Sequence, residues 1–219
     1  MSYNLFKLIF VLILFSILFV SCSTKSIYNL NKTICDNKAP KLCKKIGDEY
    51  FYGIYETGYA MRGKSGHTIN YDWAREFYKK SCDGGYAEGC AALASTYTDS
   101  KTDEKKGVIY SPDLYEKYIK KACDLNDAKS CNNLGVIFYD RGNFSQALKL
   151  YEKACGNGSV VACGNAASMY VKSKDYEKAK KVVDKCNNST KDLSDFFDCR
   201  KILDAIKYRE QFEYDANKY

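Results

Sequence analysis

The sequence has few of the residues that interrupt helices and few of those that most often hold metals. Its 219 residues include two prolines, fourteen glycines and one histidine. So few prolines and glycines exclude collagen-like and linker-rich architectures and favour a mostly helical chain. A single histidine leaves too few side chains for a histidine-based triad or for a metal site with several histidines. The apolar fraction of 46% and the charged fraction of 28% are typical of a globular protein.

The motifs of serine β-lactamases and related hydrolases are also missing. No serine is followed three residues later by lysine, and the patterns S-D-N, K-T-G and G-x-S-x-G do not occur. The single histidine, His67, lies in a long predicted loop, where we expect an incidental solvent-facing residue. We therefore predict no catalytic residue, no cofactor and no metal ligand.

The longest hydrophobic run lies near the N-terminus. It extends from Leu8 to Val20, follows Lys7 and contains one polar residue. These thirteen residues are too few for a bilayer-spanning helix, which needs about twenty, but they suit the core of a secretory signal peptide. We predict a signal peptide over residues 1–21, and therefore export.

The four residues that end at Cys22 (FVSC) resemble the bacterial lipobox, with Phe19 in place of the usual leucine. The resemblance implies that Cys22 becomes the diacylated first residue of the mature chain. Ser23 in the second mature position then favours the outer membrane of a Gram-negative cell, with residues 22–34 as a tether. The alternatives are a plain signal peptide or an uncleaved anchor, in which Cys22 has no such role.

Cysteine is abundant, with eleven copies that follow a pattern. Apart from Cys22 they form four couples separated by eight positions and a fifth separated by thirteen: Cys35 and Cys43, Cys82 and Cys90, Cys123 and Cys131, Cys155 and Cys163, Cys186 and Cys199. Zinc sites prefer shorter C-x2-C or C-x4-C spacings joined by histidines, so zinc is not expected. In an exported chain we predict five disulfides, each joining the two members of a couple.

The couples mark an internal repeat of helix pairs. The residues three, four and seven positions after the second cysteine are apolar, small and aromatic, as in Leu134, Gly135 and Phe138. Offsets of three, four and seven lie on one helical face. At the seventh position the four couples have Tyr50, Tyr97, Phe138 and Tyr170. A second helix follows, most clearly over residues 143–155, and because one such pair cannot bury its apolar face alone, the pairs are expected to stack into a solenoid.

This pattern carries a family resemblance. The spacing of the tetratricopeptide pattern is found at Leu134, Gly135, Phe138, Ala147, Tyr151 and Ala154. The variable loop between the helices and the paired cysteines resemble Sel-1-like repeats, and the combination over residues 35–200 is similar to the Helicobacter cysteine-rich protein family. The resemblance implies an all-α fold: a right-handed α-solenoid of disulfide-stapled helix-turn-helix repeats over residues 35–212. We expect repeats at about 35–82, 83–123, 124–155 and 156–186, and a capping helix at 192–212.

The resemblance also implies a binding surface, because tetratricopeptide-like stacks bind extended peptides in a concave groove lined by the first helix of each pair. Transferring that pattern to this chain selects Lys41, Lys44, Asp48, Tyr52, Glu88, Ser95, Lys129, Asn132, Tyr139 and Lys172, together with Asn133 and Asn165, which match an asparagine common in this helix. Asparagine amides can hold a peptide backbone and lysines a carboxylate. The alternative is that these residues are simply the exposed positions of their helices.

We therefore expect a non-enzymatic periplasmic, outer-membrane or secreted module that binds a protein, an extended peptide or a peptidoglycan fragment. Some members of the family are described as penicillin-binding or β-lactamase proteins, so the resemblance implies weak β-lactam binding or hydrolysis as the alternative. The formal charge is +7, but lysines and glutamates share the predicted helices, which is typical of solvated faces. Nucleic acid is not an expected partner for an exported chain, and membrane contact is expected only through a lipid at Cys22.

Overall fold

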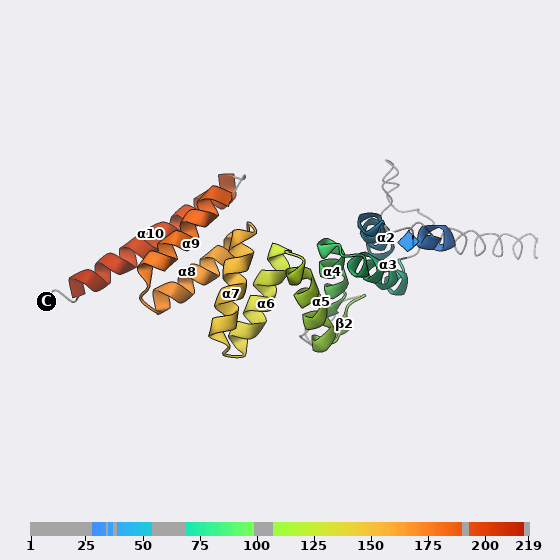
Figure 1. Cartoon of the computed structure of the whole chain (residues 1–219), viewed down its shortest axis with the longest axis horizontal. Helices are drawn as coiled ribbons and strands as arrows, with labels where there is room; N and C mark the ends of the chain where they lie inside the picture. Colours follow the sequence, from blue (N-terminus) through green and yellow to red (C-terminus); the bar gives the residue numbers. More distant parts are fainter. Residues whose placement is uncertain are drawn as a thin grey trace, which may run out of the picture. The chain divides into compact units, whose positions relative to one another are not determined.

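The structure is a computed structural model that describes residues 28–33, 35–36, 39–53, 69–98, 107–189 and 193–216, with the backbone alone at 186–189, 193–199 and 215–216. Most of these residues are helical, and consecutive helices run back and forth as hairpins (Figure 1). The predicted fold class, an α-solenoid of disulfide-stapled helix pairs, is confirmed. Cys22, His67, the predicted signal peptide and the side chains of Cys186 and Cys199 lie outside the described residues.

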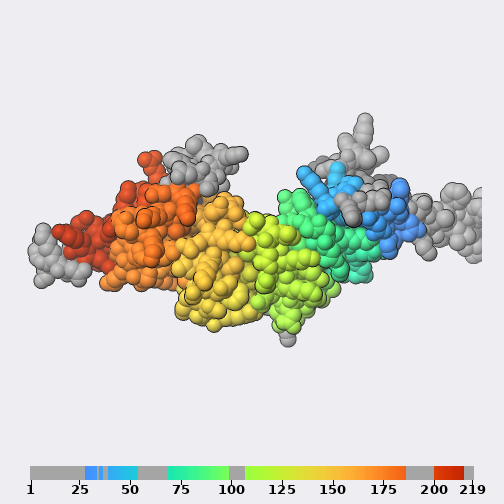
Figure 2. All heavy atoms as spheres, viewed as in Figure 1, coloured from blue at the N-terminus to red at the C-terminus, as the bar shows by residue number. Residues whose placement is uncertain are grey.

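The helices are α2 (Pro40–Tyr52), α3 (Tyr71–Asp83), α4 (Ala87–Ala94), α5 (Pro112–Asp124), α6 (Ala128–Asp140), α7 (Phe144–Gly156), α8 (Val160–Lys172), α9 (Tyr176–Ser189) and α10 (Leu193–Ala216). Two short strands, β1 (Tyr97–Thr98) and β2 (Ile109–Tyr110), lie between α4 and α5. The chain divides into two compact units, Met1–Gly89 and Cys90–Tyr219, called unit 1 and unit 2 below. Within unit 2 the helices from α5 to α10 pack against one another in chain order (Figure 2).

Helix starts are set by local side-chain chemistry. The side chains of Asn70, Asp127, Asn143 and Ser159 each accept a hydrogen bond from the backbone N–H three residues later, at 2.7–3.3 Å. These bonds satisfy one of the N–H groups that a helix start leaves unpaired. α2 and α5 begin with proline, which has no N–H to leave unpaired.

The turn that leads from one helix pair to the next has the same backbone in three repeats. Three residues after the first cysteine of a couple, Gly85, Asn126 and Gly158 have φ values of 84°, 70° and 93°. Glycine and asparagine adopt this left-handed conformation at the least cost. The turn reverses the chain, so that the Cα atoms of Cys123 and Cys131 lie 4.5 Å apart, within the range of a disulfide.

Three of the predicted disulfides are Cys35–Cys43, Cys123–Cys131 and Cys155–Cys163, with Cα atoms 5.2, 4.5 and 4.6 Å apart. Cys82 and Cys90 are disulfide-bonded as well. All eight of these cysteines are buried. The fifth pair, Cys186 with Cys199, stays a prediction.

In two of the pairs, the small residue predicted on the first helix lies where the second helix crosses it. A Cβ atom added at Gly47 would lie 2.5 Å from Cδ1 of Tyr78, and one added at Gly135 would lie 2.6 Å from Cε1 of Tyr151. Real Cβ contacts are longer, so only glycine allows a tyrosine ring of the second helix to lie this close to the first. These contacts place α2 against α3 and α6 against α7.

Part of the predicted tether is packed. Residues 28–33, within the tether expected over 22–34, are helical. The ring of Tyr28 stacks on Trp73 at 4.5 Å between centroids, and its hydroxyl donates to the carboxylate of Glu76. Trp73 and Phe77 form an aromatic face of α3 that would be exposed without this segment, and Tyr28 packs on it. The part of the tether that the structure describes is therefore a structural segment of unit 1.

The second repeat departs from the expected pattern after its first helix. α4 ends at Ala94, and the hydroxyl of Thr96 donates to the carbonyl of Leu93 at 2.7 Å. Tyr97, predicted on the apolar face of a longer helix, instead lies in β1, which pairs in parallel with β2. Its ring stacks on Tyr118 of α5 at 5.9 Å between centroids. Threonine side chains that bond a backbone carbonyl compete with the helix, which explains the early end.

The final helix, α10, packs on α9 and α8. Ile206 is buried among the helices, Lys180 of α9 forms an ion pair with Glu210 at 2.6 Å, and Lys174 forms one with Glu213 at 3.2 Å. α10 is longer at its C-terminal end than the capping helix expected over 192–212. Among the described residues, no helix has the length and hydrophobicity required to cross a bilayer.

Candidate functional site

Most of the predicted groove residues lie on the first helices of their pairs, and four of them are brought together in unit 2. Nδ2 of Asn165 on α8 donates to Oδ1 of Asn132 on α6 at 2.9 Å. Nζ of Lys172 donates to the hydroxyl of Tyr139 at 2.7 Å and lies 5.3 Å from its ring centroid. We call these two polar contacts the rungs, because each joins α6 to α8.

A cavity of about 300 Å³ lies beside the rungs. Its lining comes from α6, α7 and α8 and consists of Val136, Tyr139, Tyr151, Asn165, Ser168, Met169 and Lys172. Val136 and Met169 supply apolar surface, whereas Asn165 and Lys172 supply polar groups. A recess with apolar walls and a few fixed polar groups is the usual form of a binding site.

The asparagine rung retains unused hydrogen-bonding capacity. Each amide side chain has an acceptor oxygen and a donor nitrogen. The bond between the two asparagines uses Nδ2 of Asn165 and Oδ1 of Asn132. For Asn132 Nδ2 and Asn165 Oδ1, the described part of the chain supplies no further protein partner. One donor and one acceptor are therefore available to a ligand.

Tyr151 in the cavity lining and Tyr170 on α8 both have raised pKa values. Burial raises the pKa of Tyr151, and the negative charge of Asp140 raises it further. On the neighbouring face, a hydrogen bond to Glu152 raises the pKa of Tyr170 to about 12. A raised pKa keeps the Tyr151 hydroxyl protonated near neutral pH, so it can hold a ligand by a hydrogen bond.

Several predicted residues are not part of this site. Lys129 is exposed at the start of α6, and Asn133 is half-buried beside Asn132, but neither joins a rung or lines the cavity. Ser95 follows the end of α4, and its hydroxyl donates to the carbonyl of Ala92 at 2.7 Å. Tyr52, at the end of α2, packs its ring edge-on against Phe51 at 4.9 Å.

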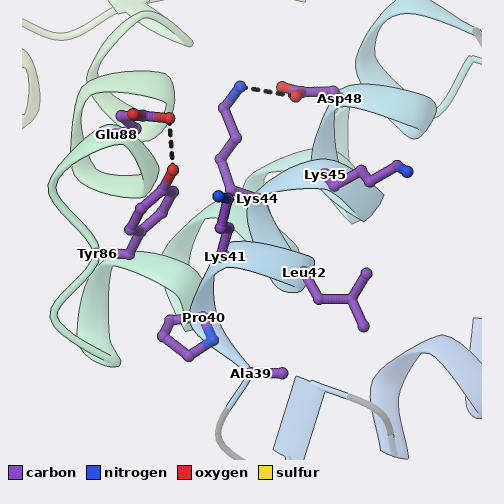
Figure 3. Close-up of a pocket in the computed structure, with 9 residues that line it drawn as sticks. All are labelled: Ala39, Pro40, Lys41, Leu42, Lys44, Lys45, Asp48, Tyr86 and Glu88. Atoms are coloured by element: carbon purple, nitrogen blue, oxygen red, sulfur yellow. Dashed lines mark hydrogen bonds and ion pairs between the residues drawn. The ribbon is translucent and has the colours of Figure 1, made fainter.

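Unit 1 has a separate pocket of about 550 Å³, formed by α2 and the segment that leads into α4 (Figure 3). Nζ of Lys44 lies 2.8 Å from Oδ2 of Asp48, and the hydroxyl of Tyr78 donates to Oδ1 of Asp48 at 2.9 Å. Across the pocket, the hydroxyl of Tyr86 donates to Glu88 at 2.6 Å, and this bond raises the pKa of Tyr86 to about 12. The structure thus places Lys44, Asp48 and Glu88, all predicted groove residues, around one recess.

Transfer of the repeat pattern missed the residues that line the walls of the unit 2 cavity. Val136 lies one turn after Asn132, and Met169 lies one turn after Asn165. That spacing of four residues, a polar residue followed by an apolar one on the same face, could have identified them. Within the described ranges, no group of three or more His, Cys, Asp or Glu side chains is arranged to hold a metal ion.

Comparison with known proteins supports the repeat architecture. Residues 128–155 and 160–192 each match the tetratricopeptide repeat family. The chain is similar to cytochrome c oxidase assembly factor 7A of Xenopus laevis, with 30% identity over 156 residues, 67% of this chain and 66% of that protein. It is also similar to cytochrome c oxidase assembly factor 7 of Xenopus tropicalis, with 28% identity over 172 residues, 74% of this chain and 68% of that protein.

Among solved structures, a Sel1 repeat protein from Oxalobacter formigenes has a TM-score of 0.53 and 21% identity, over 69% of this chain and 57% of that one. The chain thus spans about two thirds of the length of the frog proteins and less of the Oxalobacter protein. The matches agree on one architecture, tetratricopeptide-like repeats in a Sel1 fold. The narrower resemblance to the Helicobacter cysteine-rich family and the lipobox at Cys22 stay predictions.

Proposed function

We propose that this protein is a non-enzymatic scaffold that binds an extended segment of a partner protein along the first helices of its repeats. The observation that carries the proposal is the pair of rungs, because Tyr139, Asn165 and Lys172 line one cavity with Val136 and Met169, and Asn132 bonds to Asn165 beside it. Fold alone does not define a function. The rungs do more, because they hold polar groups of two successive repeats in fixed positions.

The chemistry of the site suits a peptide backbone. Along an extended peptide, N–H and C=O groups alternate, and successive side chains point to opposite sides. The available donor of Asn132 and acceptor of Asn165 can pair with one peptide unit, while a side chain of the peptide enters the cavity against Val136 and Met169. Lys172 lies at the edge, where it can attract a carboxylate.

The curated relatives are named as assembly factors. We propose a role of the same general class for this chain, namely holding partner proteins without chemical catalysis. The alternative of β-lactam binding or hydrolysis has the family resemblance as its only basis, and no contact among the described residues favours it. We expect the purified oxidised protein to leave the chromogenic cephalosporin nitrocefin unchanged.

We also propose that the protein acts outside the cytoplasm, as a lipoprotein of the periplasm or outer membrane anchored at Cys22. The hydrophobic run from Leu8 to Val20 and the lipobox-like residues support export. The disulfides support it as well, because such bonds persist in oxidising compartments. Metabolic labelling with a fatty-acid analogue tests the anchor: label should enter the wild-type chain and be lost in Cys22→Ala.

The binding site is tested by selecting random peptides from a phage library on the full oxidised chain in a mild detergent. We expect selected peptides to lose about tenfold in affinity for the Asn132→Ala, Asn165→Ala double variant, because two ligand hydrogen bonds are removed. Fluorescence anisotropy with the labelled peptides measures this. The control is Asn157→Ala, whose amide also bridges two repeats, bonding the Asn126 carbonyl at 3.3 Å, but lies away from the cavity.

Two results would contradict the proposal. One is that no peptide is enriched above the background of the support. The other is that the selected peptides bind the double variant and the wild-type chain equally well. Circular dichroism of each variant confirms that the helices are retained, so that a loss of binding is not a loss of fold.

A further inference from the structure

We infer that the pocket of unit 1 is a second binding site, and that its ligand is an acidic peptide segment with an aliphatic side chain. The inference rests on the proposed function only in taking the ligand to be a peptide, and it does not depend on the rungs of unit 2. The pocket has a volume of about 550 Å³, within the range of sites for small ligands and peptide side chains.

One wall of the pocket is basic. Lys41, Lys44 and Lys45 all line it and are spaced at i, i+3 and i+4 along α2. Residues with this spacing are neighbours on a helix surface. Lys41 and Lys45 are exposed, whereas Lys44 is half-buried. A ligand that enters the pocket therefore meets lysine side chains of α2.

The two carboxylates of the pocket already have partners. Asp48 accepts from Lys44, and Glu88 accepts from the hydroxyl of Tyr86 (Figure 3). Asp48 also accepts from the hydroxyl of Tyr78. The lining holds three lysines and two acids, a formal charge of 3 − 2 = +1. Among the residues that the structure describes, Lys41 has no ion-pair partner. Lys41 therefore presents a positive charge that an acidic ligand can neutralise.

Apolar residues at the start of α2 also line the pocket. Ala39 and Pro40, which precede and begin α2, line the pocket together with Leu42, whose side chain is 40% exposed. An aliphatic side chain placed here removes apolar surface from water on both partners, worth about 25 cal/mol for each Å² buried. A recess with apolar and basic walls suits a peptide in which acidic and aliphatic residues alternate. A flat anionic membrane could reach the exposed lysines but not fill the recess.

The test uses the full oxidised chain in a neutral detergent with two fluorescein-labelled peptides, Ac-EDLEDLE and its uncharged isostere Ac-QNLQNLQ. We expect the acidic peptide to bind about tenfold more tightly, and its affinity to fall between about 10 and 150 mM salt because screening weakens exposed charge pairs. The Lys41→Glu, Lys45→Glu variant should lose about tenfold in affinity for the acidic peptide, since each contact changes from attraction to repulsion. Leu42→Ala should weaken both peptides by a few-fold.

A matched control separates the pocket from the general field of the protein. The control is the double variant Lys149→Glu, Lys181→Glu, which changes the net charge by the same amount at exposed positions of α7 and α9. It should alter the affinity for the acidic peptide by less than about twofold. An equal loss in this control, or equal binding of the two peptides, would overturn the inference. So would lysine-dependent binding to phosphatidylglycerol vesicles without lysine-dependent peptide binding.

The asparagine double variant of unit 2 distinguishes the two proposals. It should bind Ac-EDLEDLE as tightly as the wild-type chain if the unit 1 pocket is an independent site. If it loses that affinity while the Lys41→Glu, Lys45→Glu variant keeps it, the acidic peptide binds at the rungs and the inference is wrong. Failure of the library peptides to depend on Asn132 and Asn165 would affect only the proposed function.

Discussion

The two units bury their cores with opposite kinds of side chain. In unit 1 the core is aromatic: Tyr50 stacks on Phe77 at 5.4 Å between centroids, and Tyr28 stacks on Trp73 at 4.5 Å. In unit 2 the buried positions are filled mainly by small residues, among them Ala122, Ala147, Ala154, Ala162, Ala166, Ala167 and Ala179. Both units nevertheless contain a helix crossing in which a tyrosine ring lies against a glycine, Tyr78 on Gly47 and Tyr151 on Gly135.

The difference shows what each position in a repeat array requires. A helix pair inside unit 2 is covered by helices before and after it, so small residues suffice and allow close approach. The first repeat must cover its aromatic face with a short segment, residues 28–33, and large rings bury more area per residue than alanines do. We therefore expect unit 1 to depend on a few large side chains and unit 2 on many small contacts.

The largest effect that tests this comparison is expected from Phe77→Ala. Phe77 and Leu150 are equivalent, each five positions before the first cysteine of its couple, and both are buried. Phe77→Ala should lower the free energy of unfolding by about 3–5 kcal/mol and Leu150→Ala by about 2–3 kcal/mol, because the larger ring leaves the larger cavity. Urea unfolding followed by far-UV circular dichroism measures both.

The fluorescence of Trp73, the single tryptophan of the chain, reports on unit 1 alone. Phe77→Ala should shift the fluorescence transition more than the dichroism transition, whereas Leu150→Ala should do the reverse. If the two substitutions shift both signals equally, the units unfold as one body and the contrast between their cores has no energetic meaning.

Disulfide removal should have an intermediate effect that is alike in both units. The bonds Cys35–Cys43 and Cys155–Cys163 both join residues eight positions apart, so the chain-entropy model gives the same loss, about 2.5 kcal/mol, when either pair is changed to alanine. The two variants should differ in hydrogen–deuterium exchange. Without Cys35–Cys43 the amides of the segment before α2 should exchange faster, and without Cys155–Cys163 those of α7 and α8 should. A large difference in stability would show that packing, not chain entropy, decides the contribution.

Replacing the glycine at the helix crossing should destabilise both units by a similar amount. The expected difference in stability between the units therefore arises from the rest of their cores. Gly47→Ala and Gly135→Ala should each cost about 1–3 kcal/mol, because the new methyl group would overlap a tyrosine ring. Gly156→Ala is the control, since nothing lies within 4 Å of an added Cβ there, and it should be neutral or stabilise the helix by up to about 1 kcal/mol. Thermal unfolding of the three variants measures which of them are less stable than the wild-type chain.

The smallest difference between the two units is expected in their unfolding at high pH. Burial raises the pKa of Tyr28 to about 12, with the hydrogen bond to Glu76 adding to the shift, and burial also raises the pKa values of Tyr50 and Tyr78. The unfolded chain loses these protons near pH 10. The stabilisation is therefore complete below pH 10 and is lost as the pH rises towards 12.

Because these three tyrosines lie in unit 1, the transition of Trp73 fluorescence should occur at a lower pH than the dichroism transition of the whole chain. Tyrosinate absorbance at 295 nm, recorded in parallel, follows the deprotonation itself. Coincident transitions would mean that the tyrosines of unit 2, such as Tyr170 with its pKa of about 12, control alkaline unfolding as strongly.

Local chemistry was sufficient to predict much of the fold. The C-x7-C spacing located the turns, and three positions after Cys82, Cys123 and Cys155 stands a residue that tolerates a left-handed backbone, as at Asn126 and Gly158. The same period predicted which residues face the core, and Leu134, Gly135 and Tyr151 are buried there. It was wrong for Tyr97, since a single threonine ended the helix before that residue.

The binding surface could be predicted only in part. Repeat position selected Asn132, Tyr139, Asn165 and Lys172, but equally Ser95 and Lys129, which do not join them. Whether two polar side chains on successive helices meet depends on how far each helix advances and rotates relative to the last. That geometry is set by packing over many residues, and no short motif encodes it.

The sequence by itself determined the helix pairs, their turns and the sites of the described disulfides, because helix periodicity, turn conformation and an eight-residue spacing are local properties. Tertiary structure decided the rest: that residues 28–33 cover the aromatic face of α3, that the rungs join α6 to α8, and that lysines of α2 share a recess with Tyr86 and Glu88. These contacts join residues far apart in the sequence, such as 33 positions for the rungs and 48 for Tyr28 with Glu76. They exist only once the helices have packed, which is why the residue pattern alone did not specify them.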